Sequence, residues 1–141
     1  TRVLKLLLDQ DVIVICGGGG GIPVLRKPDG SLIGIEAVID KDAASALLAQ
    51  ELGADALLLL TDVPAVMTGF GTPEQAEIGV ITPEAALKLD LPAGSMRPKV
   101  AAAARFAVTG GMAGIGRLTE AAQILGGQAG TRVQTSKGET A

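Results

Sequence analysis

Histidine, tryptophan and tyrosine are absent from this 141-residue chain, and cysteine occurs only once, at Cys16. Without histidine, a Ser-His-Asp triad, a Cys-His nucleophile pair and most zinc sites are excluded. A single cysteine cannot form a disulfide within the chain, and its place at the end of an apolar run predicts a small buried side chain. Hydrolase and zinc-enzyme functions are therefore set aside.

Basic charge and long apolar stretches are also scarce. The chain has 12 Lys and Arg residues against 15 Asp and Glu, a net charge of −3, and this excludes nucleic acid as the main partner. No apolar run reaches the roughly 18 residues that would span a bilayer, so we expect no membrane partner. Residues 1–5 lack the layout of a signal peptide, and we expect a cytoplasmic protein.

Aliphatic residues and glycine are what the sequence has in quantity. Apolar residues make up 48% of the chain but aromatic residues only 1%, so the core must be built from Leu, Ile, Val and Ala. Such a composition favours an α/β fold in which aliphatic strands pack against alanine-rich helices. We expect one domain over residues 1–133, followed by a flexible tail at 134–141.

Apolar periodicity and turn residues predict the order of the elements. The first part should contain a short helix at 3–8, a strand buried on both faces at 12–16, a β-hairpin at 24–35, a helix at 40–53 and a buried strand at 56–60. The second part should contain a long loop, a weak strand at 78–81, a short helix from Thr82, a helix at 96–108 capped by Ser95, a weak strand at 112–116, a helix at 118–125 and a strand at 130–133. Strand, helix and strand over residues 12–60 predict a right-handed parallel crossover.

Three adjacent charges, Asp40, Lys41 and Asp42, lie between an apolar run and an alanine-rich helical pattern. Such charges are costly to bury unless they face a ligand or one another, so they are the first candidates for chemistry. Together with the glycines at 17–21 and with Lys99, they could bind a phosphate-sized anion through N–H and ammonium donors. The alternative is that Asp40 caps the helix while Lys41 and Asp42 are solvated in its first turn.

The glycine run at 17–21 directly follows the predicted strand at 12–16. A flexible linker would normally carry serine and lie at a domain edge, so this position favours an anion-binding turn. Both common nucleotide fingerprints, the P-loop and G-x-G-x-x-G, are missing from the sequence. Lys99 would lie in the first turn of its helix, where a cation opposes the helix dipole and must be offset by an anion.

Five blocks of sequence, in the same order, resemble carbamate kinases of the amino acid kinase family. They are residues 17–24, 36–42 with 44–49, 60–63, 92–100 and 127–133. The most specific are the Asp-Lys-Asp segment and the Gly-Ser-Met-x-Pro-Lys segment. The resemblance implies the C-terminal, nucleotide-binding half of an amino acid kinase domain, with a mostly parallel sheet between helical layers in a three-layer αβα arrangement.

The resemblance also implies an activity, the interconversion of ATP plus carbamate with ADP plus carbamoyl phosphate, with Mg²⁺, in a homodimer that serves arginine metabolism. Lys41 and Lys99 would neutralise charge on the transferring phosphoryl group, and Asp40 would orient the two lysines. No side chain is assigned as a metal ligand. The residues implied to hold the nucleotide are Gly18, Gly19, Gly20, Thr61, Asp62, Val63, Met67, Ser95 and Met96.

Three places depart from the family's pattern, and two other functions stay open. One is the segment 113–118, where the family usually has an aliphatic strand. Pro64 stands where we expect an acidic residue, and Met67 stands where we expect an aromatic ring. Because the family's N-terminal half is missing from the resemblance, we expect the 141-residue chain to be inactive alone. The alternatives are another amino acid kinase, acting on an acylated amino acid, and a non-catalytic nucleotide-binding or subunit-interaction module. The glycine run and the Gly-Ser-Met-x-Pro-Lys segment argue against the former.

Overall fold

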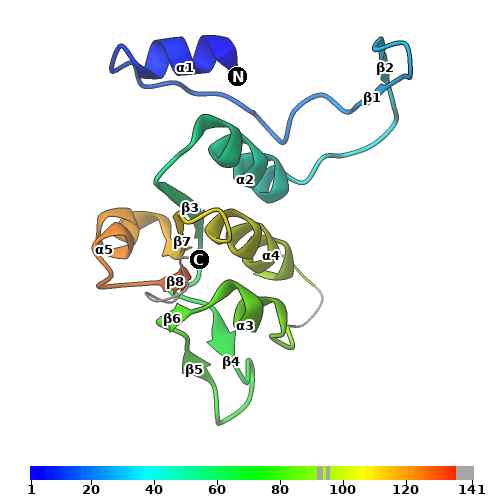
Figure 1. Ribbon diagram of the computed structural model, residues 1–141. Helices are drawn as coiled ribbons and strands as arrows, with labels where there is room; N and C mark the ends of the chain where they lie inside the picture. Colours follow the sequence, from blue (N-terminus) through cyan, green and yellow to red (C-terminus); the bar gives the residue numbers. More distant parts are fainter. Residues whose placement is uncertain (92–93, 95, 136–141) are drawn as a thin grey trace.

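The computed structural model describes residues 1–91, 94 and 96–135 of the chain (Figure 1). Its helices are α1 (Arg2–Leu8), α2 (Lys41–Leu52), α3 (Pro83–Leu87), α4 (Met96–Ala107) and α5 (Ala121–Leu125), with a 3-10 helix η1 (Leu118–Glu120). Its strands are β1 (Val24–Arg26), β2 (Leu32–Gly34), β3 (Ala56–Thr61), β4 (Met67–Thr68), β5 (Ala76–Glu77), β6 (Val80–Ile81), β7 (Met112–Arg117) and β8 (Thr131–Val133). None of the helices in these described ranges is long and apolar enough to cross a bilayer.

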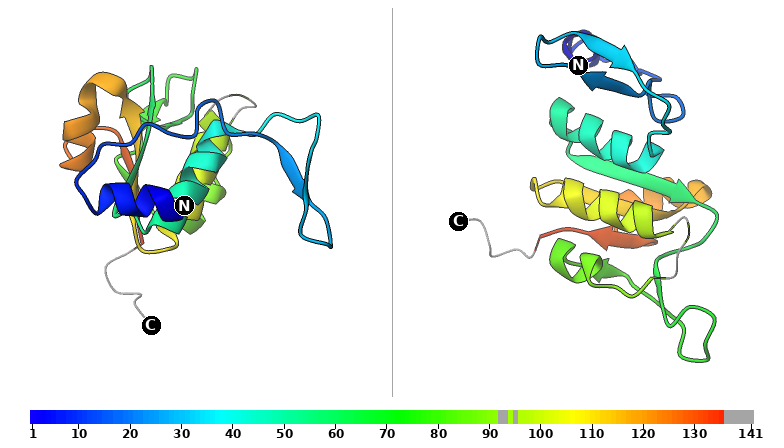
Figure 2. Two further views of the ribbon diagram at one scale, coloured as in Figure 1. Left: turned by 90° about the horizontal axis from the view of Figure 1, so that it is seen from above. Right: turned by 90° about the vertical axis from the view of Figure 1, so that its right-hand side faces the viewer.

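The main sheet has four strands in the order β3-β7-β8-β6. β3 is parallel to β7 and β6 is parallel to β8, whereas β8 runs antiparallel to β7. Helices α2 and α4 pack on one face of this sheet, with α3 beside α4, and α5 packs on the other face (Figure 2). The predicted three-layer α/β arrangement is confirmed, with a sheet that is mixed because β8 opposes its neighbour β7.

Small side chains allow the layers to approach one another closely. Ala46 of α2 and Ala103 of α4 are both fully buried in the core beneath the helical layer on one face of the sheet. On the other face, a Cβ atom added to Gly114 of β7 would lie 2.5 Å from Ile124 of α5, so only glycine fits there. The 112–116 segment, which the sequence indicates only weakly, therefore forms a central strand whose glycines admit a helix side chain.

Local signals set the ends of the main helices. Asp40 caps α2 by accepting a hydrogen bond from the Ala43 N–H at 2.8 Å, and Gly53 ends the helix in the left-handed region with φ of 72°. Thr82 caps α3 in the same way, ahead of Pro83. The predictions of the 24–35 hairpin, the 40–53 helix and the 56–60 strand are confirmed. Ser95 and residues 136–141 of the expected tail lie outside the described residues.

The sheet and its covering helices, residues 41–133, are called the body. Residues 1–40 form an arm beside it, made of α1, a connection and the β1-β2 hairpin (Figure 1). The prediction of a buried strand at 12–16 is wrong, since these residues have no regular structure and Ile13 and Ile15 are 93% and 98% exposed. Cys16 is exposed as well, and the predicted crossover lacks its first strand. The physical reason is that no strand within the described residues pairs with this segment, and a strand is buried only by its neighbours.

Candidate functional site

Two helices begin at the same edge of the main sheet. α2 packs on β3 and leads into it, and α4 packs on β7 and leads into it. Because each helix runs back along the strand that follows it, its first turn lies at the carboxyl end of that strand. Since β3 and β7 are parallel, both first turns share one edge. Ligands of α/β proteins bind at this kind of edge.

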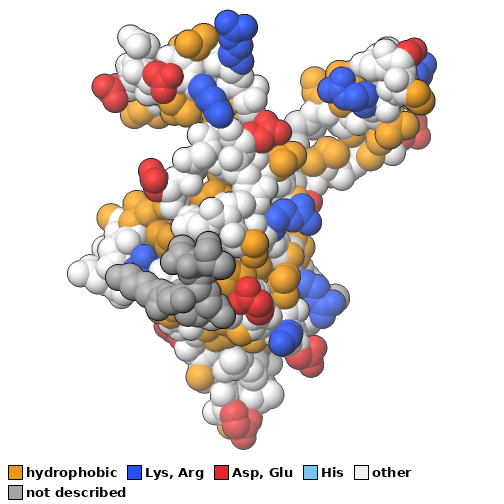
Figure 3. All heavy atoms as spheres, in the orientation of Figure 1, with side chains coloured by type: hydrophobic (Ala, Val, Ile, Leu, Met, Phe, Trp, Pro, Cys, Tyr) orange, Lys and Arg blue, Asp and Glu red, His pale blue; other side chains and the backbone are white. Residues whose placement is uncertain are grey.

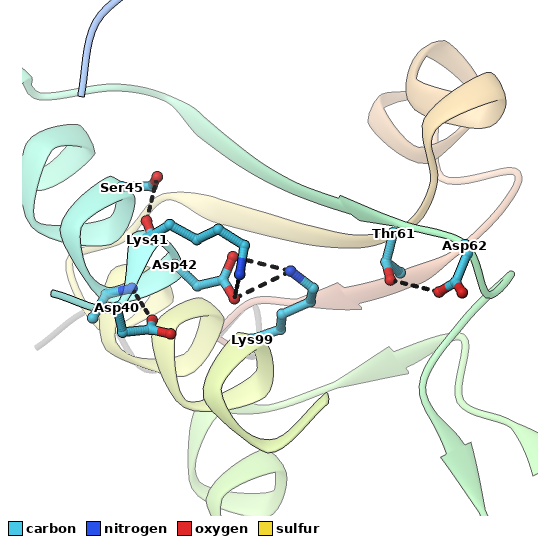
Figure 4. A network of polar contacts seen from close by, with 8 residues as sticks. Asp40, Lys41, Asp42, Ser45, Thr61, Asp62 and Lys99 are labelled. Atoms are coloured by element: carbon cyan, nitrogen blue, oxygen red, sulfur yellow. Dashed lines mark hydrogen bonds and ion pairs between the residues drawn. The ribbon is translucent and has the colours of Figure 1, made fainter. Parts of the chain in front are cut away.

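A buried ion pair joins the first turns of these two helices. Lys99 Nζ of α4 donates to both carboxylate oxygens of Asp42 in α2, at 3.0 and 3.1 Å, and each residue is only 6% exposed. Lys41 Nζ lies 3.9 Å from Asp42 Oδ2, and the Lys41 side chain is 63% exposed. Two ammonium groups therefore converge on one carboxylate, one of them buried and the other open to solvent (Figure 4).

The charges of this cluster favour a bound anion. The two ammonium groups face the single carboxylate of Asp42, and the N–H groups at the start of α4 add partial positive charge. The Asp40 carboxylate accepts the Ala43 N–H and so offsets the partial charge at the start of α2. An ammonium carries three N–H donors, so the Lys99 side chain keeps one beyond its two contacts with Asp42. The arrangement can hold two cations at fixed positions against the oxygens of a phosphoryl group.

Asp40, which was predicted to orient the lysines, has a different contact. Its carboxylate accepts the Ala43 N–H at 2.8 Å and so acts as the cap of α2. The residue between the two ammonium groups is Asp42. Periodicity could have identified it, because Asp42, Ala46 and Ala49 share the buried face of α2 at a spacing of four and three residues.

The glycine turn contacts the chain just ahead of this cluster. The Gly20 N–H donates to the Gly17 carbonyl at 3.1 Å, and Gly20 has a φ of 130°. A Cβ atom on Gly20 would clash with the Ile39 carbonyl, so the turn lies directly against the residue that precedes Asp40. The structure thus brings Gly20 close to the start of α2, with Gly18 and Gly19 in the same turn. Anion binding by this turn remains a prediction.

The residues expected to hold a nucleotide follow the end of β3. Thr61 ends the strand, and its hydroxyl donates to the Asp62 carboxylate at 3.0 Å (Figure 4). Val63 is half-buried at the start of the loop, and Met67 is half-buried in β4. Met96 opens α4 and packs against the core, so it belongs to the same helix turn as Lys99. Thr61 and Asp62 therefore share the edge at which the ion pair lies.

Carboxylates do not gather into a metal centre. Within residues 1–91, 94 and 96–135, no group of three His, Cys, Asp or Glu side chains is placed to hold a metal ion. Asp42 is already paired with Lys99, and the Asp62 carboxylate accepts a hydrogen bond from the Thr61 hydroxyl. The chemistry that this cluster offers is charge stabilisation and positioning by lysines and N–H groups, without a side-chain nucleophile.

Comparisons with known proteins agree on the relatives of this chain. The model of the Amino acid kinase family matches residues 1–115. The carbamate kinase of Rhizobium meliloti is 47% identical over 138 residues, covering 96% of this chain and 43% of that protein. The carbamate kinase of Haemophilus influenzae is 50% identical over 133 residues, covering 94% of this chain and 43% of that protein.

Solved structures give the same result. The carbamate kinase from Giardia lamblia bound to AMP-PNP superposes with a TM-score of 0.89 at 41% identity, covering 96% of this chain and 49% of that chain. The likeness therefore extends from the sequence to the arrangement of the helices and strands. In each comparison, the chain spans less than half the length of its relative.

Proposed function

This chain belongs to the amino acid kinase family, and we propose that it is the nucleotide-binding, C-terminal half of a carbamate kinase-like phosphotransferase. The observation that supports this most is the convergence of Lys41 and Lys99 on Asp42, at the edge where β3 ends. Identity of 47% to a carbamate kinase supports the choice of reaction. The proposed substrates are ADP and carbamoyl phosphate in one direction, and ATP and carbamate in the other.

The proposed reaction transfers one phosphoryl group between two oxygens. Towards ATP, an oxygen of the ADP β-phosphate bonds to the phosphorus of carbamoyl phosphate while the bond to the carbamate oxygen breaks, and carbamate leaves with the electron pair. Charge spreads over the three equatorial oxygens of the group in transfer, so the protein's part is positioning and electrostatic stabilisation. Lys99 and Lys41 would supply the positive charge, and Asp42 would hold the two ammonium groups in place.

The remaining parts of the site would hold the nucleotide. The N–H groups around Gly18, Gly19 and Gly20 would face phosphate oxygens, as glycine turns do at other anion sites. Thr61 at the end of β3, with Asp62, Val63 and Met67 after it, would contact the base and ribose. Met96 at the start of α4 and Ser95, which lies outside the described residues, would do so as well. Magnesium would enter with the nucleotide, because Mg²⁺ binds largely through substrate phosphates and water.

A chimeric enzyme gives the most direct test of the activity. We would replace the aligned 133 residues of the Haemophilus influenzae carbamate kinase with this chain's own residues, since the two are 50% identical there. With ADP, Mg²⁺ and carbamoyl phosphate, the chimera should form ATP, and the same chimera with Lys99→Ala should lose about 10²-fold in turnover. A folded chimera without activity would contradict the proposal.

The isolated chain should behave differently. We infer that it binds Mg·ADP weakly and forms no ATP, because reaction requires both substrates in line within about 3–3.5 Å and a small misplacement costs roughly 10²-fold. A coupled assay for ATP checks this directly. Robust ATP synthesis by the 141-residue chain, with contaminating kinase excluded, would contradict the inference of inactivity and still support the assigned reaction.

A second candidate function, a subunit-interaction module, rests on a separate observation. The arm exposes large apolar side chains such as Ile13, Ile15 and Ile22, which are 85% exposed or more. Exposed apolar side chains in series indicate a surface that another polypeptide covers. Under this alternative, the chain would associate with a partner without binding nucleotide.

For the leading proposal, we also infer that the carbamate kinase-like enzyme is a cytoplasmic homodimer in arginine metabolism, as the resemblance implies.

A further inference from the structure

A long excursion of the chain leaves the main sheet after β3 and returns to it at β6. It contains the short β4-β5 hairpin, and its tip exposes Phe70, at 65% exposure. The two ends of the excursion meet at the sheet, where the Ile78 N–H donates to the Val66 carbonyl at 2.8 Å. We call residues 62–78 the β3-β6 loop.

The side chain of Thr131 links two residues of the β3-β6 loop to the sheet: Val66, just before β4, and Ile78, just after β5. Its hydroxyl accepts a hydrogen bond from the Val66 N–H at 2.8 Å and donates one to the Ile78 carbonyl at 2.5 Å. Thr131 lies in β8, between β7 and β6, and is completely buried. The two partners are 65 and 53 residues away in sequence, so the contact is wholly tertiary.

The hydroxyl is the chemically important part of this contact. A hydroxyl has one donor and two acceptor sites, and the Thr131 hydroxyl both donates and accepts here. Val66 is 1% exposed, so its N–H would have no water to replace the hydroxyl. An unpaired buried N–H or carbonyl is costly, so removing the hydroxyl should force the ends of the loop to move.

Two glycines allow close packing in this region: Gly116 lies against the start of the loop, and Gly130, beside Thr131, lies against β7. A Cβ atom on Gly116 of β7 would lie 2.8 Å from the Pro64 carbonyl, so the loop starts directly on the strand. Gly130, next to Thr131, has a φ of 71°, and a Cβ atom there would lie 2.7 Å from the Ile115 carbonyl. The backbone at the base of the loop therefore packs closely against the sheet, whereas the tip of the loop is exposed.

We propose that Thr131 is a positioning residue for the nucleotide, because its hydroxyl sets the conformation of the loop that would hold base and ribose. This inference rests on the proposed function, in which Val63 and Met67 of the loop contact the nucleotide. Thr131 itself is too deeply buried to touch a ligand, and it acts through Val66 and Ile78. Its loss should weaken nucleotide binding more than it weakens the fold.

Two variants separate the hydroxyl from the methyl group of Thr131. Thr131→Val keeps the shape and removes the hydroxyl, whereas Thr131→Ser keeps the hydroxyl and removes the methyl group. By titration calorimetry on the 141-residue chain, Thr131→Val should raise the Kd for Mg·ADP about tenfold, and Thr131→Ser should stay within about threefold of the unmodified chain. Val133→Ala, in the same strand and also buried, should lower stability and leave the Kd unchanged.

Hydrogen exchange gives a readout that does not depend on nucleotide. The Val66 amide should exchange at least about tenfold faster in Thr131→Val, with amides of β3 and β7 as slow as before, and Thr131→Ser should restore its protection. Unchanged Val66 exchange in Thr131→Val would overturn the inference. If Thr131→Val does not fold, Thr131→Ser decides, because a folded Ser variant that has lost nucleotide affinity would contradict a role for the hydroxyl.

The outcomes also separate this inference from the proposed function. If the unmodified chain binds no Mg·ADP, both the nucleotide-binding part of the proposed function and this inference are overturned. If the unmodified chain binds and Thr131→Val binds equally well, this inference alone fails and the proposed function stands. Weaker binding in Val133→Ala to the same degree as in Thr131→Val would show a general loss of stability and would also overturn the inference.

Discussion

Two apolar runs of similar composition differ in solvent exposure: one is buried and the other is exposed. Leu57 and Leu59 of β3 are 8% and 4% exposed, whereas Ile13 and Ile15 of the arm are almost completely exposed. β3 pairs with β7 and is covered by α2, and residues 12–16 have no strand partner among the described residues. The difference shows that burial depends on what lies beside a strand, and the strand's own apolarity does not supply it.

The same contrast extends over whole regions. Among the described residues, the buried core lies entirely within 41–133. Figure 3 shows apolar side chains of the arm at the surface, on both α1 and the hairpin. The boundary passes through the Asp40, Lys41 and Asp42 triplet, where an exposed cap is followed within two residues by a buried carboxylate. The predictions below test this division, beginning with the largest expected effect.

Asp42→Ala should destabilise the body more than any change in the arm. It leaves Lys99 buried at 6% exposure without its carboxylate, and removing one member of a buried pair costs about 3–5 kcal/mol. Urea unfolding of the variant measures the loss. Asp40→Asn is the matched control, because Asn caps a helix as well as Asp does, and it should change stability by less than about 0.5 kcal/mol. If the two variants lost the same free energy of unfolding, the boundary between arm and body would not lie within this triplet.

Matched isoleucine truncations compare the two regions directly. Ile115→Ala removes a fully buried side chain from β7 and should cost about 2–5 kcal/mol. Ile15→Ala removes a side chain that is 98% exposed and should change the unfolding free energy by less than about 0.5 kcal/mol. Thermal or urea unfolding of both variants is the measurement. A large loss from Ile15→Ala would mean that the arm packs against the body in solution.

Lys41→Ala should separate catalysis from stability at the boundary. Its side chain is 63% exposed, so its ion pair adds little to the fold, but we expect its charge to act most strongly on the transition state. In the Haemophilus chimera, turnover should fall by about 10²-fold with nucleotide affinity within a few fold. Lys88→Ala, an exposed lysine at the end of α3, should leave turnover unchanged. Near-normal turnover in Lys41→Ala would remove Lys41 from the site.

The smallest expected effect is a change in the pKa of Asp29, at the tip of the β1-β2 hairpin. The Ser31 hydroxyl and then the Ser31 N–H both donate to the Asp29 carboxylate, and these hydrogen bonds lower the pKa of Asp29. The ionised carboxylate therefore stabilises the turn above its ordinary pKa, and this contribution is lost as the pH falls through the lowered pKa. An NMR titration should show Ser31→Ala raising the pKa of Asp29. An unchanged pKa would show that the hydroxyl does not matter there.

Much of the fold could be predicted because its signals are local. The bounds of α2 follow from the cap Asp40, the end signal Gly53 and the alanine-rich pattern between them. The run of leucines at 57–60 predicts β3. The charge pattern indicated Lys41 and Lys99 as candidates, and the family resemblance added the three-layer arrangement and the roles of these two lysines. These features depend on residues within a turn or two of one another, or on motifs with fixed spacing.

The remaining features depend on tertiary contacts that local patterns do not carry. The exposure of residues 12–16 depends on which strands are available to pair with them, and a sequence run cannot contain that information. Helical periodicity places Asp42 on the buried face of α2, but its partner Lys99 is 57 residues away, and no local pattern names that partner. The Thr131 contact joins residues 65 positions apart, and no local pattern indicates it.

Titration calorimetry of the 141-residue chain with ADP in the presence of Mg²⁺ tests the central claim most directly. If residues 1–133 are the nucleotide-binding half of a carbamate kinase-like site, a folded sample should bind ADP at one site per chain, with a Kd of about 0.1–1 mM. No binding up to about 10 mM ADP, by protein whose cooperative unfolding shows an intact body, would contradict the claim.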